Sequence, residues 1–89
     1  MKRQHFKLMA QTNLDHICER IEELEEELMR TSASSVLFKQ LEDERDALIE
    51  QYNALDAIPK NEWSTAMLRF IKARDLLLQK LKQTERLAA

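Results

Sequence analysis

Hydrophobic residues recur along most of this chain at alternating intervals of three and four positions, which is the spacing of one face of an α-helix. The first regular series is Leu14, Ile17, Ile21, Leu24 and Leu28, with acidic residues on the opposite face. Phe6 and Ala10 continue the same face toward the N-terminus. The pattern predicts a helix over about residues 4–30. Asn13 is one candidate for its capping residue, and the alternative is an earlier start, near Lys2.

The segment Thr31–Ser35 is rich in hydroxyl side chains and interrupts this series. Such side chains compete for backbone hydrogen bonds, so they favour turns and helix ends over helix interiors. The apolar series then resumes in a different phase with Leu37, Phe38, Leu41, Leu48, Ile49, Tyr52 and Leu55. This predicts a second helix over about residues 35–57. The change of phase favours a helical hairpin over the alternative, one long continuous helix.

Pro59 lacks a backbone donor and restricts the residue before it, so we expect it to end the second helix. Asn61 is placed to cap a third helix, with Glu62 in the first turn, where an acid is favourable. The apolar side of this helix carries Trp63, Met67, Phe70, Ile71, Leu77, Leu78 and Leu81. The third helix is therefore predicted over about residues 61–87.

The composition agrees with an entirely helical chain. Its 89 residues include no Gly and one Pro, whereas strand-rich folds need Gly repeatedly at turns. With 44% hydrophobic residues, the chain is too apolar for a disordered tail. The predicted fold class is all-α, with three helices in one domain over residues 1–89. We expect an antiparallel hairpin plus a C-terminal helix, as a small bundle or a coiled-coil-like structure.

The chain contains no candidate membrane span. Its longest uncharged stretch, Thr31–Phe38, is far shorter than the ~20 apolar residues that a spanning helix needs. The N-terminal residues are basic, but no apolar segment follows them, which argues against a signal peptide. Cys18 is the single cysteine, so an internal disulfide is excluded and a reducing compartment fits. We expect a cytoplasmic protein that does not bind membranes.

Charge is unevenly distributed along the chain. Residues 11–58 are strongly acidic, whereas residues 59–89 hold seven bases against three acids. The bases that share one face of the predicted third helix are Arg69, Lys72 and Lys80, with Arg86 close by. This face makes direct nucleic-acid binding an alternative function. The acidic pI of about 5.7 and the lack of aromatic residues among these bases argue against it.

Two arginines lie inside apolar series. Arg45 falls between Leu41 and Leu48, and Arg74 lies at the centre of the third helix's apolar side. A buried unpaired charge is costly, so each needs an acid, for which Glu25 is one candidate, or must bury its stem while its head reaches water. The alternative is that both face another subunit or protein, where polar residues in an apolar seam fix the register.

Leu68, Leu76 and Leu87 point away from the apolar side of the third helix. A helix that is apolar on two faces is usually covered on both, and three helices of this size do not easily cover both faces of one. This favours an oligomer or an obligate partner. The alternative is a set of scattered surface leucines, which need no special cause.

Constellations for catalysis, metal binding or cofactor binding are absent from the sequence. His16 and Cys18 are two positions apart on a predicted helix and therefore diverge, and His5 lies in the basic leading segment. Cys18 adjoins the apolar series and is most simply a small buried hydrophobic residue. Without Gly, no phosphate-binding glycine loop can form. We expect no enzymatic activity and no cofactor.

One stretch has a spacing typical of a known family. Its elements are Phe38, Asp43, Glu44, Arg45, Ala47, Ile58, Pro59 and Trp63. Over about residues 36–63 the chain resembles the Hha/YmoA family, small helical bacterial proteins that bind the nucleoid protein H-NS and modulate its gene silencing. The resemblance implies that Asp43 and Arg45 contact the partner, and that Ile58, Pro59 and Trp63 pack the last helix.

The leading functional hypothesis is a helical protein–protein interaction module: an adaptor, a chaperone-like protein or a dimerising protein that binds another protein or itself. The alternatives are an Hha-like modulator of a nucleoid or transcription protein, and nucleic-acid binding through the basic C-terminal helix. The residues that we expect to contact a partner are Asp43, Arg45, Trp63, Leu68, Arg74, Leu76 and Leu87.

Overall fold

A computed structural model describes the backbone of residues 3–31 and 35–88 and the side chains of residues 3–27 and 36–87. Its elements are α1 (Arg3–Thr31), α2 (Ser35–Ala54), the short 3-10 helices η1 (Leu55–Ala57) and η2 (Lys60–Glu62), and α3 (Trp63–Ala88). The described residues form three α-helices and no strand, so the prediction of an all-α fold is confirmed.

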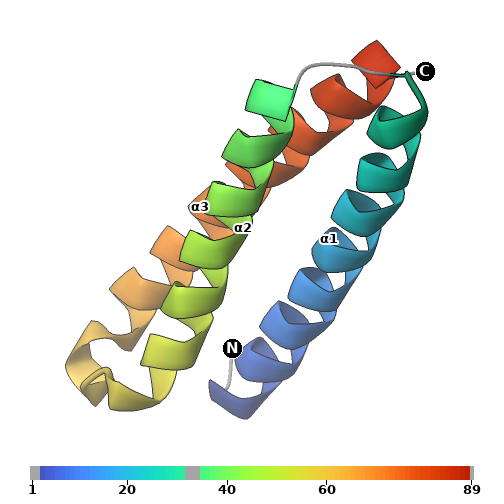
Figure 1. Ribbon diagram of the computed structural model, residues 1–89. Helices are drawn as coiled ribbons and strands as arrows, with labels where there is room; N and C mark the ends of the chain where they lie inside the picture. The colour runs from blue at the N-terminus through green and yellow to red at the C-terminus, as the bar shows by residue number, and fades with distance from the viewer. Residues whose placement is uncertain (1–2, 32–34, 89) are drawn as a thin grey trace.

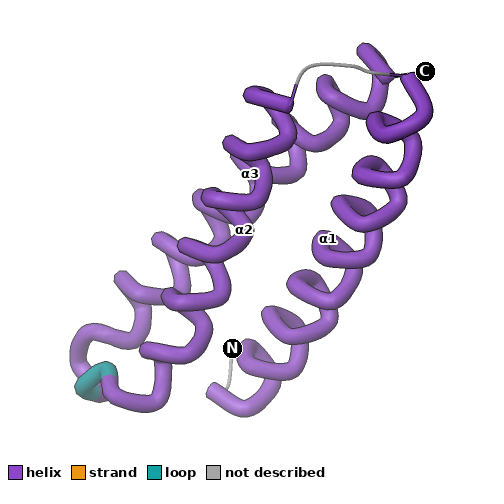
Figure 2. The backbone as a smooth tube through the Cα atoms, in the orientation of Figure 1, coloured by secondary structure: helices purple, strands orange, loops and turns teal. Residues whose placement is uncertain are grey.

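The three α-helices lie side by side, and each reverses the direction of the one before it (Figure 1). Between α2 and α3 the chain turns through η1 and η2, which are separated by Ile58 and Pro59, the short loop in Figure 2. The result is a rod of 47 × 19 × 17 Å. Every pair of α-helices is in contact, so each helix lines a shared core.

Each helix buries most of the apolar face that its spacing predicts, whereas Leu37 of the second series is 38% exposed. The buried residues are Phe6, Ala10, Leu14, Ile17, Ile21 and Leu24 of α1, Leu41 and Leu48 of α2, Leu55 of η1, and Trp63, Phe70, Leu77 and Leu81 of α3. The side chain of Leu28, the last predicted member of the first series, lies outside the described residues. Burying a large apolar side chain stabilises a fold by roughly 1.5–3 kcal/mol, so this core is the main source of stability.

Phe6 joins the beginning of α1 to α3. Its ring packs edge-on against Trp63 and Phe70, with centroid distances of 6.3 and 5.7 Å. Arg3 covers the other side of this cluster, with its guanidinium carbon 4.3 Å from the centre of the Trp63 ring. Edge-to-face aromatic pairs contribute about 0.5–1.5 kcal/mol beyond the area that they bury. The first turns of α1 and α3 are therefore held together.

Basic side chains of α1 also hold the corner where α2 ends. Arg3 Nη2 donates to the carbonyl oxygens of Leu55 and Asp56, at 3.3 and 3.2 Å. Lys7 Nζ lies 2.6 Å from the Asp56 carboxylate. The last turn of α2 has no basic residue of its own. The cations of α1 therefore provide the positive charge that carbonyl groups at a helix end favour.

Of the two expected starts of the first helix, the one with Asn13 as its capping residue is wrong. Asn13 lies inside α1, where its side-chain amide donates to the backbone carbonyl four residues earlier. The helix begins at Arg3 among the described residues, which agrees with the earlier of the two expected starts, although Lys2 itself is not described. Because Phe6 and Ala10 are buried, packing extends the helix well ahead of Asn13.

The turn between α2 and α3 differs from the prediction in its details. α2 ends at Ala54, and the segments 55–57 and 60–62 are 3-10 helices. Pro59 imposes extended backbone on itself and on Ile58, with ψ of 149° and 130°. Asn61 is therefore inside a 3-10 turn and does not cap α3, which begins at Trp63. Most of the predicted interruption at Thr31–Ser35 lies outside the described residues, since residues 32–34 are not described.

Candidate interaction surface

Large apolar side chains are exposed on all three α-helices, and on α1 the exposed residue is Leu8, at 63%. On α3, Leu68, Leu76 and Leu87 are 61%, 58% and 74% exposed. On α2, Val36 and Leu37 are 65% and 38% exposed. A single exposed leucine is ordinary, but exposed apolar residues that gather on one surface indicate a binding site. The position of each exposed apolar residue therefore decides whether it belongs to such a site.

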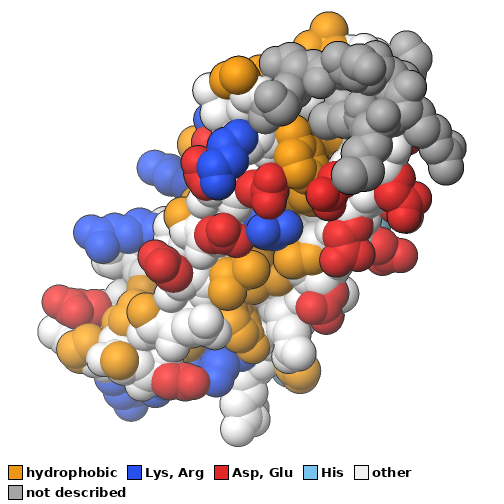
Figure 3. All heavy atoms as spheres, viewed as in Figure 1, with side chains coloured by type: hydrophobic (Ala, Val, Ile, Leu, Met, Phe, Trp, Pro, Cys, Tyr) orange, Lys and Arg blue, Asp and Glu red, His pale blue; other side chains and the backbone are white. Residues whose placement is uncertain are grey.

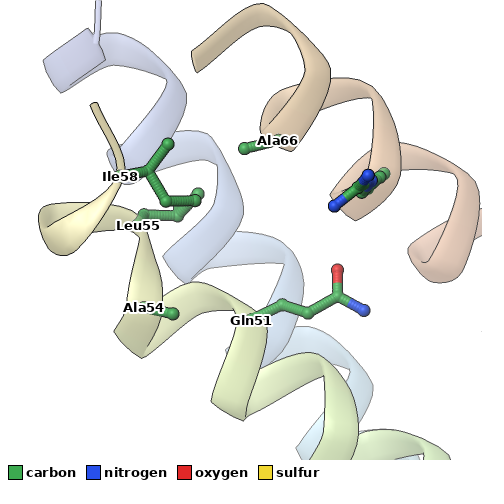
Figure 4. A pocket seen from close by; sticks show the side chains of 6 residues that line it. Gln51, Ala54, Leu55, Ile58 and Ala66 are labelled. Atoms are coloured by element: carbon green, nitrogen blue, oxygen red, sulfur yellow. The ribbon is translucent and has the colours of Figure 1, made fainter. Parts of the chain in front are cut away.

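Two cavities lie along the seam between α2 and α3, one toward each end, and we call this seam with its two cavities the groove. The cavity at the Ile58 corner measures about 250 Å³ and is lined by Gln51, Ala54, Leu55, Ile58, Ala66 and Arg69 (Figure 4). In Figure 4, α1 passes behind this cavity. The cavity at the opposite end measures about 220 Å³, and its walls include Leu37, Gln40, Lys80 and Leu87. The groove thus lies on the side of α2 and α3 that α1 does not cover.

The residues along this groove recur at intervals of three and four, which keeps them on one side of each helix. On α3 the series is Ala66, Arg69, Ala73, Leu76, Lys80, Gln83 and Leu87. On α2 it is Leu37, Gln40, Glu44, Ala47, Gln51 and Ala54, with Ile58 beyond the helix end. We call these two series, with Val36, Asp43, Glu50 and Lys72 at their margins, the α2–α3 face.

Glu44 and Lys80 form an ion pair across the groove, between the two cavities. Lys80 donates to one carboxylate oxygen of Glu44. The second oxygen, Oε2, is buried and has no hydrogen-bond partner among the described residues. The pair places these two residues at the same level of the rod. It also leaves a buried acceptor in the groove, which is costly unless a donor reaches it.

Charge divides the α2–α3 face into two halves. α2 carries five acids against two bases, whereas α3 carries six bases against two acids. Figure 3 shows acidic side chains over α1 and α2, and basic side chains at the left edge of the view, where α3 lies. The face is therefore acidic along one helix and basic along the other.

Arg45 and Arg74 lie in the apolar series, as the sequence indicates, and bury most of their stems. Their side chains are 23% and 18% exposed. Arg45 Nη2 lies 3.1 Å from Asp46, and Arg74 Nη2 lies 3.0 Å from Asp75. Both pairs form within one helix, and Glu25, the suggested partner, is exposed on α1. Each arginine thus buries its stem and reaches a surface carboxylate.

Asp43 and Trp63 have opposite surroundings. Asp43 is exposed on α2, four residues before Ala47 of the α2–α3 face, with its carboxylate 3.5 Å from Lys39. Trp63 is only 7% exposed and belongs to the core. In this conformation its ring therefore offers no surface for a partner, and its role is to pack the start of α3.

Leu68 faces a different region from the other two exposed leucines of α3. It lines an apolar cavity of about 300 Å³ together with Phe6, Ser64, Met67 and Ile71. That cavity lies between α1 and α3. Leu76 and Leu87, by contrast, are three helical turns apart on the α2–α3 face. The structure thus divides the three leucines, which the sequence analysis had grouped, into two sites.

Cys18 is half-buried on α1. Burial raises the pKa of the Cys18 thiol, and the positive charge of Arg45 partly opposes this. No cluster of three or more His, Cys, Asp or Glu residues in the described part of the chain is arranged to hold a metal ion. Within the same residues, no helix is both long and apolar enough to cross a membrane.

Apart from Asp43 at its margin, the α2 half of this surface was not predicted from the sequence. Val36 and Leu37 begin it, and the small side chains of Ala47 and Ala54 continue it. The sequence pattern that marks this half is a second series of residues on α2, spaced at intervals of three and four positions. That series was hard to recognise because it consists mainly of Ala, Gln and Glu, which contribute little to a hydrophobic pattern. The same holds for Ala66 and Ala73 on α3.

The chain was compared with family models, curated proteins and solved structures, and no match was found in any of the three comparisons.

Proposed function

We propose that this protein is a non-enzymatic helical interaction module, of the adaptor, chaperone-like or dimerising kind, which binds a helical partner through the α2–α3 face. The observation that carries the proposal is the gathering of four exposed large apolar residues on this face: Val36, Leu37, Leu76 and Leu87. They flank a groove with a cavity at each end.

The groove has the form that a helix accepts. Two antiparallel helices with small residues such as Ala47 and Ala73 between larger ones leave room for the ridge of a third helix. The core already buries one face of every helix, so the fold does not need this groove for its own stability. Exposed apolar residues that the fold does not use are best explained by a partner that covers them.

Paired glutamate substitutions test this proposal. Leu76→Glu with Leu87→Glu places two charges on the face, and Leu68→Glu places one on the same helix outside it. All three leucines are exposed, so the variants should keep their helical content. In affinity purification from the native host, followed by mass spectrometry, proteins retained by the wild type should be lost with the double variant and kept with Leu68→Glu. Equal retention by all three chains would contradict the proposal.

A second candidate function is Hha-like modulation of H-NS, which the exposed carboxylate of Asp43 supports. If it holds, purified H-NS should be retained by the wild-type chain and retained less by Asp43→Asn, because a charged contact is lost. Equal binding by both chains, or no binding by either, would remove this candidate.

A further inference from the structure

We propose that the α2–α3 face binds the same face of a second copy of this chain, in a two-fold symmetric dimer whose axis runs parallel to the helices. This rests on the proposed function and names the partner. In such a dimer, α2 of each copy lies over α3 of the other, and the contact is self-complementary. Three properties of the face support it: the levels of its residues, their sizes and their charges.

Contacts within one copy show which residues share a level along the rod. Glu44 is level with Lys80, because they form an ion pair. Leu37 is level with Leu87, because they line one cavity. The two helices are antiparallel and both rise 1.5 Å per residue. The level of every other residue of α2 and α3 therefore follows from its distance in sequence to these two pairs. Rotation about an axis parallel to the helices leaves levels unchanged, and the same correspondences therefore hold between copies.

Large residues of α3 then meet small or apolar residues of α2. Leu76 is at the level of Ala47, so its exposed side chain fits over a position with little side-chain volume. Leu87 is at the level of Val36, and the two are 74% and 65% exposed in the single chain. Both contacts occur twice in the symmetric dimer. The dimer therefore covers apolar side chains that the single chain leaves in water, and this favours association.

The opposite charges of α2 and α3 favour one direction of the two-fold axis. With the axis parallel to the helices, the acidic α2 of each copy lies over the basic α3 of the other. Glu50 and Lys72 are both exposed, lie within about 3 Å of the same level and occupy the outer margins that come together. An axis perpendicular to the helices would instead place α2 on α2 and α3 on α3, with like charges opposed. Juxtaposed like charges are strongly unfavourable, so the parallel axis is preferred.

The size of the face indicates a weak dimer. α2 has 20 residues and is therefore about 30 Å long. With the 19 Å width of the rod, each copy offers about 550 Å² and the pair about 1,100 Å². Stable specific interfaces begin near about 1,200 Å². We therefore expect a monomer–dimer equilibrium that depends on concentration.

Charge reversal at Glu50 and Lys72 tests the arrangement. Sedimentation equilibrium of the full chain, from about 5 to 500 µM, should show a monomer–dimer equilibrium for the wild type. Glu50→Lys alone and Lys72→Glu alone should each weaken dimerisation about tenfold or more, because two like-charge pairs are created in each dimer. The chain with both changes should regain the wild-type constant, and so should an equimolar mixture of the two single variants. Circular dichroism of each variant checks that the fold is kept.

The inference would be overturned by a wild-type chain that remains monomeric throughout this range, or by a doubly reversed chain that dimerises as weakly as the single variants. A Leu76→Glu chain that dimerises as well as the wild type would do the same. None of these outcomes decides the proposed function, which depends on the separate retention experiment with the Leu76, Leu87 and Leu68 variants.

Discussion

At the residue scale, the corner near the N-terminus shows how exposed contacts act on this fold. Arg3 donates to two carbonyl groups at the end of α2 and covers the Trp63 ring. Lys7 pairs with Asp56 on the same corner. Exposed cation–π contacts contribute roughly 0.5–1 kcal/mol, and exposed ion pairs contribute less than that on average. These contacts therefore position the first turn of α1, and the buried Phe6 provides most of the free energy.

The pKa of the Asp56 carboxyl group is a direct probe of this corner. The hydrogen bond from Lys7 lowers the pKa of Asp56 below its ordinary value of 3.8, and the positive charges of Lys7 and Arg3 act in the same direction. A group whose folded pKa is lowered stabilises the fold above its unfolded pKa, and this stabilisation is lost as the pH falls through the folded value. The effect therefore belongs to the acid range, below about pH 4.

We expect NMR titration to show a lowered pKa for Asp56 in the wild type and a pKa closer to the ordinary value in Lys7→Gln. Lys39→Gln is the matched control, because Lys39 pairs with Asp43 and not with this corner. An Asp56 titration that is the same in the wild type and in Lys7→Gln would show that the pair does not form in solution.

At the scale of the element, α3 carries two different faces. One contains Phe70, Leu77 and Leu81, which are at most 1% exposed and form part of the core. The other contains Leu76 and Leu87 beside the groove. The first face serves the stability of the single chain, and we assign the second to association. Substitutions on the two faces should therefore affect different measurements.

Leu81→Ala should lower the free energy of unfolding by about 2–5 kcal/mol, because it leaves a cavity in the core. Leu76→Ala should change it by less than about 0.5 kcal/mol in dilute solution, where the chain is monomeric, since an exposed side chain loses little on truncation. Urea denaturation followed by circular dichroism measures both. Similar losses for the two variants would mean that Leu76 is buried in the folded monomer.

At the scale of the whole molecule, the bundle is closed by contacts between its first and its last α-helix. Phe6 is in the first turn of α1, yet it packs against Trp63 and Phe70 of α3. Farther along the rod, Arg20 of α1 binds Glu85 of α3, with Nε 3.3 Å from Oε2. α1 therefore contacts α3 near both ends, and the three helices should unfold as one unit.

Phe6→Ala tests this closure. It should cost about 3–5 kcal/mol, a large part of the 5–15 kcal/mol by which small domains are usually stable. Thermal unfolding monitored by circular dichroism should show a strongly lowered Tm, with Trp63 fluorescence changing in the same transition. Phe6→Leu keeps most of the buried volume and should lose much less. A transition in Trp63 fluorescence that precedes the loss of helix would indicate that α1 separates independently.

The sequence predicted the coarse fold well because helix formation depends on a local pattern. The series from Phe6 to Leu24 and from Trp63 to Leu81 mark faces that are buried. Helix ends were less predictable: Asn13 and Asn61 have the chemistry of caps, but buried neighbours and the extended backbone at Pro59 determine where the helices begin. Trp63 was expected both in the apolar series of the third helix and among the partner-contacting residues, and its burial agrees with the first of these expectations.

What the sequence determined by itself is the all-α class and the apolar face of each helix, since a period of three and four residues is encoded in consecutive positions. Only the tertiary structure decided which exposed residues share a surface. It separated Leu68 from Leu76 and Leu87, and placed Glu44 level with Lys80 across a groove. Those relations depend on how each helix is rotated and shifted against its neighbours, and packing between residues far apart in the chain sets that arrangement.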